Sequence, residues 1–212
     1  MKNIQVPIDF GIMTTAGAYT VVASPGGVCA STMTGSSSVS IDPLPTIYSL
    51  TGGGSYCESG TGVHIGLSGS STSVKYQLYR GSLVTGSSMT GTGSALDFGL
   101  QTGAGFYSVK ATDTITGCSS MGSSTSISIS TIGLPTAYNV TGGGNYCLGG
   151  SGVHVTLAGS TTNVNYQLYL GGSAVGSAMP GTGTIIDFGT HTTAGNYTIV
   201  GTDAATLCAN NM

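Results

Sequence analysis

Charge and tryptophan are what this 212-residue chain has least of: Asp, Glu, Lys and Arg together make up 5% of it, and Trp is absent. Soluble domains average about 25% charged residues. In this chain most of the polar groups that contact water must therefore come from Ser, Thr, Asn, Gln and the backbone. Four basic residues are too few to form a positively charged surface that binds nucleic acid. No apolar run approaches 18 residues, so no membrane insertion is expected. A hydrophobic content of 39% excludes a disordered tail.

Motifs for catalysis and metal binding are also scarce. No CxxC occurs, and no His lies at ligand spacing from a Cys, which disfavours zinc. Seven acidic residues are too few for a convergent calcium site. The glycine runs lack the Lys-Ser/Thr of a phosphate loop, and no serine stands in a G-x-S-x-G elbow before a helix. The sequence therefore predicts a protein that is not an enzyme and needs no cofactor or metal.

What the chain does contain is an internal period of 90 residues. The tripeptide Leu-Pro-Thr at 44–46 returns at 134–136, and the same shift carries over the motifs GVH, YQLY and DFG. Aligned without a gap, residues 44–118 match residues 134–208 at about 40 of 75 positions. This is far above chance and predicts a tandem array.

A third copy is present in part, because DFG, A-G-x-Y and a cysteine follow one another near the N-terminus as they do later. We therefore divide the chain into 1–43, the C-terminal part of a first repeat, 44–133, a complete second repeat, and 134–212, a third repeat lacking its last strand. Short Pro- and Gly-containing segments join the repeats. The N-terminus has no apolar core segment or cleavage site of a signal peptide, so we expect either that the chain is a piece of a longer protein or that its export is arranged elsewhere.

Within each repeat the apolar residues alternate with polar ones, as in half-buried strands. About seven short strands in 90 residues predict an all-β fold of tandem immunoglobulin-like Greek-key β-sandwiches. The first strand is expected at Thr46–Leu50. A G-x-Y sequence before an alternating run is typical of the tyrosine corner of this fold, and it occurs three times in register, at Tyr19, Tyr107 and Tyr197.

The phrase TGGGSYC at 51–57 returns as TGGGNYC at 141–147. It lies between the first strand and the strand beginning at Val63. Three glycines permit positive φ and a tight or bulged path, so we expect the chain to cross here from one sheet to the other.

Each later repeat has one cysteine after these glycines and one after the tyrosine-corner strand. If both loops lie at one end of the sandwich, the disulfides are Cys57–Cys118 and Cys147–Cys208 within repeats. Cys29 is then unpaired, its partner belonging to the front of the first repeat. Disulfides imply an oxidising compartment, so the expected location is extracellular or at the cell surface.

The remaining polar candidates lie at equivalent strand positions. His64 and His154 point outward and are expected to be sheet-surface residues. Asp97 and Asp187, with Asp9 before them, are expected to accept hydrogen bonds from turns, since no second carboxylate stands at a spacing suited to acid–base catalysis.

One outward tyrosine per repeat, Tyr79 and Tyr169, is a candidate sugar contact, although cross-strand packing explains such a residue more often. A carbohydrate-binding module that contacts a surface polysaccharide is therefore one alternative function.

The order L-P-T, T-G-G-G-x-Y-C, G-V-H-[IV], Y-Q-L-Y, D-F-G, A-G-x-Y and a closing Cys with a Met soon after resembles the Ig-like repeats of very large Bacteroidota surface proteins, which the type IX system typically exports. The resemblance implies an extracellular stalk, spacer or adhesin with no catalytic residue. It also implies that Thr114, in Asp-Thr-Ile, is a candidate O-glycosylation site.

The first hypothesis is thus a structural or adhesive spacer whose partners are neighbouring repeats. The second is a head-to-tail extracellular filament of copies of the chain, assembled by strand complementation. Its candidate donor is the segment with Ser36, Val39 and Ile41, a spare copy of the strand that the third repeat lacks. Arbitrary truncation of a longer array explains the same ends.

Overall fold

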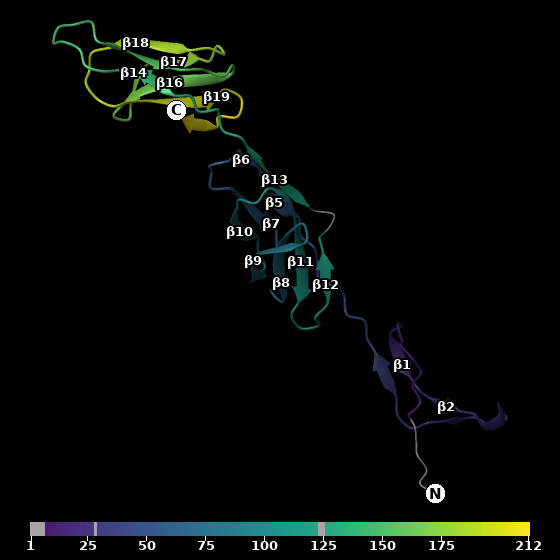
Figure 1. Cartoon of the computed structure of the whole chain (residues 1–212). Coiled ribbons are helices and arrows are strands. Elements are labelled where there is room, and N and C mark those ends of the chain that lie inside the picture. The colour runs from purple at the N-terminus through teal and green to yellow at the C-terminus, as the bar shows by residue number, and fades with distance from the viewer. Residues whose placement is uncertain (1–6, 28, 123–125) are drawn as a thin grey trace.

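The computed structural model describes residues 7–27, 29–122 and 126–212 (Figure 1). The molecule is all-β and elongated, with the N- and C-terminal parts at opposite ends. Its one helical element among the described residues is the 3-10 turn η1 (Pro25–Gly27). No helix in the described part of the chain is long and apolar enough to cross a membrane. The first six residues of the first repeat lie outside the described ranges.

The second repeat is a two-sheet sandwich. One sheet has the order β10-β7-β5, and the other has the order β6-β13-β11-β8-β9, with β12 also paired to β11. Neighbouring strands are antiparallel except β6 and β13, which run parallel. The bounds are β5 (Leu50–Gly52), β6 (Gly54–Cys57), β7 (Val63–Leu67), β8 (Val74–Arg80), β9 (Leu83–Thr90), β10 (Leu96–Gln101), β11 (Gly105–Asp113), β12 (Ser119–Met121) and β13 (Ile127–Ile132).

The third repeat has the same plan, with sheets β14-β15-β18 and β17-β16-β19-β20. No counterpart of β6 or β13 is present among its described strands. The bounds are β14 (Val140–Gly142), β15 (Val153–Leu157), β16 (Val164–Leu170), β17 (Ser173–Pro180), β18 (Ile186–His191), β19 (Tyr197–Asp203) and β20 (Ala209–Asn211).

Each sandwich has its own hydrophobic core, formed by the inward residues of the alternating strands. The central side chains of the second repeat include Ile65, Tyr76 and Tyr107, each at most 1% exposed. In the third repeat the core centres on Tyr166 and Ile199. No residue belongs to both clusters, so each sandwich is packed independently.

In the glycine-rich segment 51–57 the chain passes from one sheet to the other, as expected. β5 belongs to one sheet and β6 to the other, and the three glycines at the crossing, Gly52 at the end of β5, Gly53, and Gly54 at the start of β6, all have positive φ. A Cβ on Gly52 would lie 2.0 Å from the backbone oxygen of His64. Only glycine therefore fits where this strand passes so close to its neighbour.

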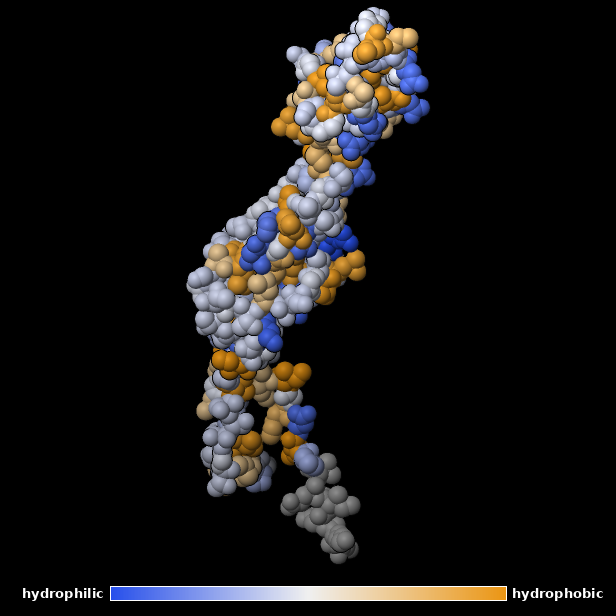
Figure 2. All heavy atoms as spheres, turned by 90° about the vertical axis from the view of Figure 1, so that its left-hand side faces the viewer, coloured by the Kyte–Doolittle hydropathy of each residue, from blue (hydrophilic) through white to orange (hydrophobic). Residues whose placement is uncertain are grey.

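The first segment forms two short ladders, β1 (Gly17–Tyr19) with β4 (Ser37–Val39), and β2 (Val22–Ala23) with β3 (Ser31–Thr32). No side chain is buried among its described residues up to 44. Figure 2 accordingly shows hydrophobic side chains on the surface of this end of the molecule. This part of the chain thus lacks a core of its own.

Several strand expectations differ from the structure. The first strand of the second repeat covers Leu50–Gly52, because residues 46–49 precede the ladder. The segment read as a crossing loop contains strand β6, and the Ser- and Gly-rich strand β9 has no clear alternation in sequence. β6 matters most, since it determines where the first cysteine of the repeat lies.

Candidate functional site

The junction between the second and third repeats is closed by a disulfide bond from Cys57 to Cys208, with the Cα atoms 5.5 Å apart. Cys57 ends β6, and Cys208 directly precedes β20. The bond therefore joins two consecutive repeats, and Cys208 is 1% exposed within the contact. Figure 1 places β6 and β13 at the end of the second repeat that faces the third.

Hydrogen bonds tie the same region together. The backbone N–H of Glu58 donates to the carbonyl of Ile132, which holds the end of β6 against the end of β13. The Asn210 side chain donates from Nδ2 to the carbonyl of Pro135, at 2.9 Å. Pro135 is buried, as is its counterpart Pro45, so this end of the linker packs on the third repeat itself.

The predicted disulfides Cys57–Cys118 and Cys147–Cys208 are therefore wrong, because Cys57 and Cys208 are bonded to each other. The prediction placed both cysteines of a repeat at one end of the sandwich. Cys57 ends a strand parallel to β13, whereas Cys118 follows β11, which is antiparallel to β13.

The two cysteines of a repeat hence lie at opposite ends. The nine residues of β11 alone span roughly 30 Å, while a disulfide requires Cα atoms within about 7 Å. No disulfide can close within one repeat across that length.

The described cysteines outside this bond are Cys29, Cys118 and Cys147. By the 90-residue shift, Cys147 corresponds to Cys57, and Cys118 corresponds to Cys208. The first cysteine of a repeat thus faces forward along the array, and the second faces backward. Cys147 is exposed and Cys118 is half-buried. Each lies at the end of its sandwich that corresponds to the junction between the second and third repeats, where the equivalent cysteines are bonded.

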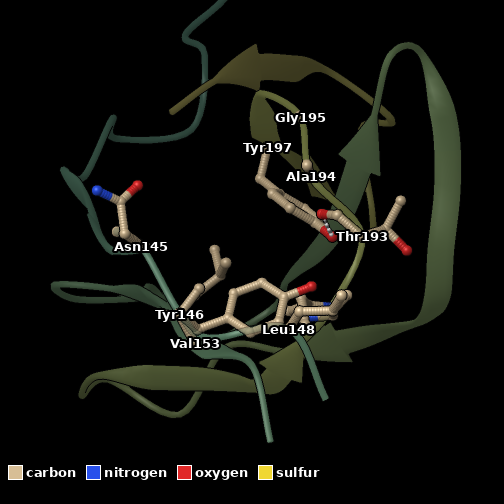
Figure 3. A pocket seen from close by; sticks show the side chains of 12 residues that line it. Asn145, Tyr146, Leu148, Val153, Thr193, Ala194, Gly195 and Tyr197 are labelled. Atoms are coloured by element: carbon tan, nitrogen blue, oxygen red, sulfur yellow. Dashed lines mark hydrogen bonds between the residues drawn. The ribbon is translucent and has the colours of Figure 1, made fainter. Parts of the chain in front are cut away.

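A second feature is a groove of about 590 Å³ at the edge of the third repeat (Figure 3). On one side lies the segment with Asn145, Tyr146 and Leu148, and on the other side lies the segment with Gly195 and Tyr197. In the second repeat the equivalent segments are β6 and the start of β11, and β13 lies between them and pairs with both. The groove is therefore the position that β13 fills one repeat earlier.

The side chains beside this position are more exposed in the third repeat than in the second. Tyr107 is 1% exposed beside β13, whereas its counterpart Tyr197 is only half-buried. Tyr146 is 39% exposed, and its hydroxyl donates to the carbonyl of Thr192 across the groove. Nε2 of His191, which also lines the groove, is buried without a hydrogen-bond partner in the part of the chain that the structure describes.

A third feature is a His–Asp pair on the outer face of each sandwich. Nδ1 of His64 lies 2.8 Å from Oδ2 of Asp97, and His154 and Asp187 repeat the contact at 2.8 Å. The sequence predicted a sheet-surface position for each histidine and turn hydrogen bonds for each aspartate, but no contact between them. The contact is diagonal, because Asp97 pairs with Gly66 and His64 pairs with Leu100 across a register shift between β7 and β10.

Each aspartate of these pairs also accepts a hydrogen bond from the backbone two residues later, as does Asp9. The His64 side chain and the N–H of Gly99 lower the pKa of Asp97 from its ordinary value. His154 and the N–H of Gly189 lower the pKa of Asp187 in the same way. The side chains of both pairs are at least half exposed, and within the described chain no group of three or more potential metal ligands gathers.

The three tyrosine-corner residues have a common geometry. Each donates its hydroxyl to the carbonyl four residues upstream, from Tyr19 at 2.8 Å, Tyr107 at 2.6 Å and Tyr197 at 2.9 Å. These bonds tie the start of each penultimate strand to the preceding turn. They are structural contacts and place no reactive group in a cleft.

The other candidates are dispersed. Tyr79 and Tyr169 are half-buried in β8 and β16, where they pair with Ser108 and Thr198 of the neighbouring strands. Thr114 is exposed, and its hydroxyl donates to the carbonyl of Ser73 at 2.8 Å. In the donor segment Ser36 and Ile41 are exposed and Val39 is half-buried, and β4 pairs with β1 of its own segment.

Comparison with protein-family models and with curated proteins gives no match for this chain. The junction and the groove are therefore interpreted from their own geometry.

Proposed function

We propose that this chain is a segment of a non-enzymatic extracellular tether or stalk, in which consecutive Ig-like sandwiches are covalently joined end to end. The observation that supports this function is the disulfide from Cys57 to Cys208. A bond that only stabilised one sandwich would close within it. This one joins two sandwiches with separate cores.

Such a bond changes how the chain transmits force. When the two ends are pulled apart, tension passes from Cys57 directly to Cys208, because the disulfide is the shortest covalent path. Residues 58–207, which include nearly all of both cores, are then outside the path of the load. Stretching cannot extend them while the bond persists.

The repeat pattern supports the same proposal for a longer array. Each complete repeat has one cysteine facing forward and one facing backward, so every junction between such repeats can hold one bond. Disulfides persist in oxidising surroundings, which supports a cell-surface or secreted location. The uncharged Ser- and Thr-rich surface and the resemblance to Bacteroidota surface repeats are consistent with a spacer or adhesin.

Force spectroscopy of single molecules tests the proposal. Under oxidising conditions the chain should extend without releasing the segment between Cys57 and Cys208, which are separated by 151 positions in the sequence. A reducing agent should add roughly 500 Å of contour length, since an extended chain spans about 3.3–3.6 Å per residue. The variant Cys57→Ser should release this length without reduction, and Cys29→Ser should behave as the unchanged protein. Equal extension with and without reductant would contradict the proposal.

A further inference from the structure

We infer that the outer face of strands β8 and β11 in the second repeat binds an acidic polysaccharide. Carboxylates of the polysaccharide contact Lys75 and Lys110, and its sugar rings stack on Tyr79 and Phe106. We call this surface the lysine face. The inference adds a ligand to the proposed stalk and does not depend on the disulfide that joins its repeats.

The lysine face consists of the outward residues of two adjacent strands. Buried and more exposed residues alternate along both strands, and the more exposed ones include Lys75, Gln77 and Tyr79 in β8 and Phe106, Ser108, Lys110 and Thr112 in β11. Lys75 pairs with Thr112, which follows Lys110 by two positions. The two lysines are therefore diagonal neighbours on one face, with Cβ atoms roughly 7 Å apart.

The described part of the chain does not neutralise these two ammonium groups. Neither Lys75 nor Lys110 forms an ion pair or a side-chain hydrogen bond within it. Asp97 is bonded to a histidine of the other sheet, and Asp113 accepts two backbone N–H groups of its own turn. Two like charges side by side repel each other, so a ligand with anionic groups at this spacing is attracted to both.

The third repeat shows that the fold does not require the charged and aromatic residues of this face. Its strands β16 and β19 pair in the same register and alternate in the same way. The counterparts of Lys75, Phe106 and Lys110 are Asn165, Asn196 and Val200. Since a sandwich of the same plan forms without them, packing does not explain why these three residues gather on one face of the second repeat.

Two aromatic rings extend the lysine face along the strands. Tyr79 pairs with Ser108, which follows Phe106 by two positions, so the two rings are diagonal neighbours as the lysines are. The Phe106 side chain is 70% exposed. The electron-rich face of an aromatic ring attracts the polarised C–H groups of a sugar ring. These residues therefore offer a stacking surface beside the two charges.

The length of the lysine face favours a polymer over a small anion. Four positions separate Phe106 from Lys110, which corresponds to roughly 14 Å along the strand. Ser108 lies between them, and Gln77 lies in the same way between the lysine and the tyrosine of β8. A chain of sugars reaches both ends and meets polar groups between them, whereas a single small anion does not.

The chemistry argues against two other partners. A second copy of this chain offers few free carboxylates, because five of its seven already accept hydrogen bonds, namely those of Asp9, Asp97, Asp113, Asp187 and Asp203. Anionic membranes are bound by clusters of about four to eight basic residues, and this face has two. A carboxylate-bearing polysaccharide is the ligand that fits both the charges and the rings.

NMR titration of the full chain with an oligosaccharide of galacturonic acid tests the inference. Each sugar of this probe has one carboxylate, and the methyl ester of the same oligosaccharide is the matched uncharged control. Amide shifts should be confined to β8, β11 and the adjacent β9 and β12, with none in β16 or β19. The methyl ester should bind roughly tenfold more weakly, and added salt should weaken binding of the charged form.

Substitutions taken from the third repeat separate the contributions. Lys75→Asn with Lys110→Val should lower the affinity for the charged oligosaccharide roughly tenfold, whereas Lys75→Arg with Lys110→Arg should preserve it. Phe106→Asn should weaken binding of the charged form and of the ester alike. Leu100→Thr, the corresponding exchange on the other sheet, should have no effect. Thermal unfolding of each variant checks that the sandwich is intact.

Three results would overturn the inference. The first is equal binding of the charged oligosaccharide and its ester, or no binding of either. The second is an affinity that the exchange of both lysines for the third-repeat residues leaves unchanged. The third is binding to vesicles of anionic phospholipid, or self-association of the chain, that is lost with the lysines while the oligosaccharide does not bind.

Discussion

At the scale of single residues, the tyrosine corner ties one hydroxyl to one carbonyl in each repeat, but in different surroundings. The bond of Tyr107 lies in a partly buried site beside β13, and that of Tyr197 lies in an exposed site beside the open groove. A hydrogen bond contributes more where water cannot replace the lost partner. The two tyrosines therefore allow the effect of burial to be measured within one chain.

Tyr107→Phe should lower the free energy of unfolding of the second repeat by about 1 kcal/mol, because the carbonyl of Gly103 loses its partner. Tyr197→Phe should cost the third repeat less, since water can reach the carbonyl of Thr193. Urea denaturation followed by NMR signals from each repeat measures both. Tyr79→Phe is the control, as its hydroxyl makes no hydrogen bond within the described residues. A larger loss for Tyr197→Phe would contradict this account.

The His–Asp pairs should make the stability of the protein depend on pH in the acidic range. Hydrogen bonds from His64 and Gly99 favour the charged carboxylate, so the pKa of Asp97 is lower in the folded state than in the unfolded chain. The stabilisation is fully present above the ordinary aspartate pKa and is lost as the pH falls through the folded value. Both partners are mostly exposed, so the effect on stability is small.

NMR titration of the Asp97 carboxyl should therefore show a midpoint below that of an ordinary aspartate. His64→Ala should raise it toward the ordinary value without reaching it, because the N–H of Gly99 remains bonded at 2.8 Å. Asp187 should respond in the same way to His154→Ala and not to His64→Ala. An Asp97 midpoint unchanged by His64→Ala would show that the ring does not bind the carboxylate in solution.

At the scale of single elements, the passage from β5 to β6 depends on glycine. Gly52→Ala should destabilise the second repeat by about 2 kcal/mol or more, because φ is +85° and the new Cβ would meet the His64 carbonyl. Gly133→Ala should be nearly neutral, since its Cβ would enter open space. Thermal unfolding of both variants measures the difference. Equal melting temperatures would mean that the crossing tolerates a side chain.

The alternating strands, the tyrosine corner and the glycine crossing could all be predicted because each depends on residues close in sequence. The cysteine pairing could not. Any repeat with two cysteines can pair them internally or with its neighbours, and both patterns use the same residues at the same period. The direction of β6 decides between them, and a four-residue Gly-Ser-Tyr-Cys strand gives almost no alternation to read.

The groove at the edge of the third repeat could likewise be predicted only in part from the sequence. Comparison of the repeats predicted that residues 134–212 include no counterpart of Ile127 and Ile129. The sequence could not show that the open space lies between Tyr146 and Tyr197, which come from segments about 50 residues apart. Nor could it show the His191 ring in that space, since the second repeat has Gln101 at this position.

At the scale of the whole molecule, the disulfide determines whether two sandwiches move as one body. Their cores are separate, and the hydrogen bond from Asn210 to Pro135 lies within the third repeat, between the sandwich and its linker. Interfaces of this kind allow relative motion unless another restraint is present. The Cys57–Cys208 bond supplies that restraint at a point away from the linker itself.

Backbone ¹⁵N relaxation should thus give one shared rotational correlation time for residues 44–212 in the oxidised protein. In Cys57→Ser the second and third repeats should reorient partly independently, so the amides of each should show a shorter correlation time. Cys118→Ser, which removes a thiol at the opposite end of the second repeat, should leave the values unchanged. If Cys57→Ser also leaves them unchanged, packing at the linker alone holds the repeats together. The disulfide would then act only when the array is under load.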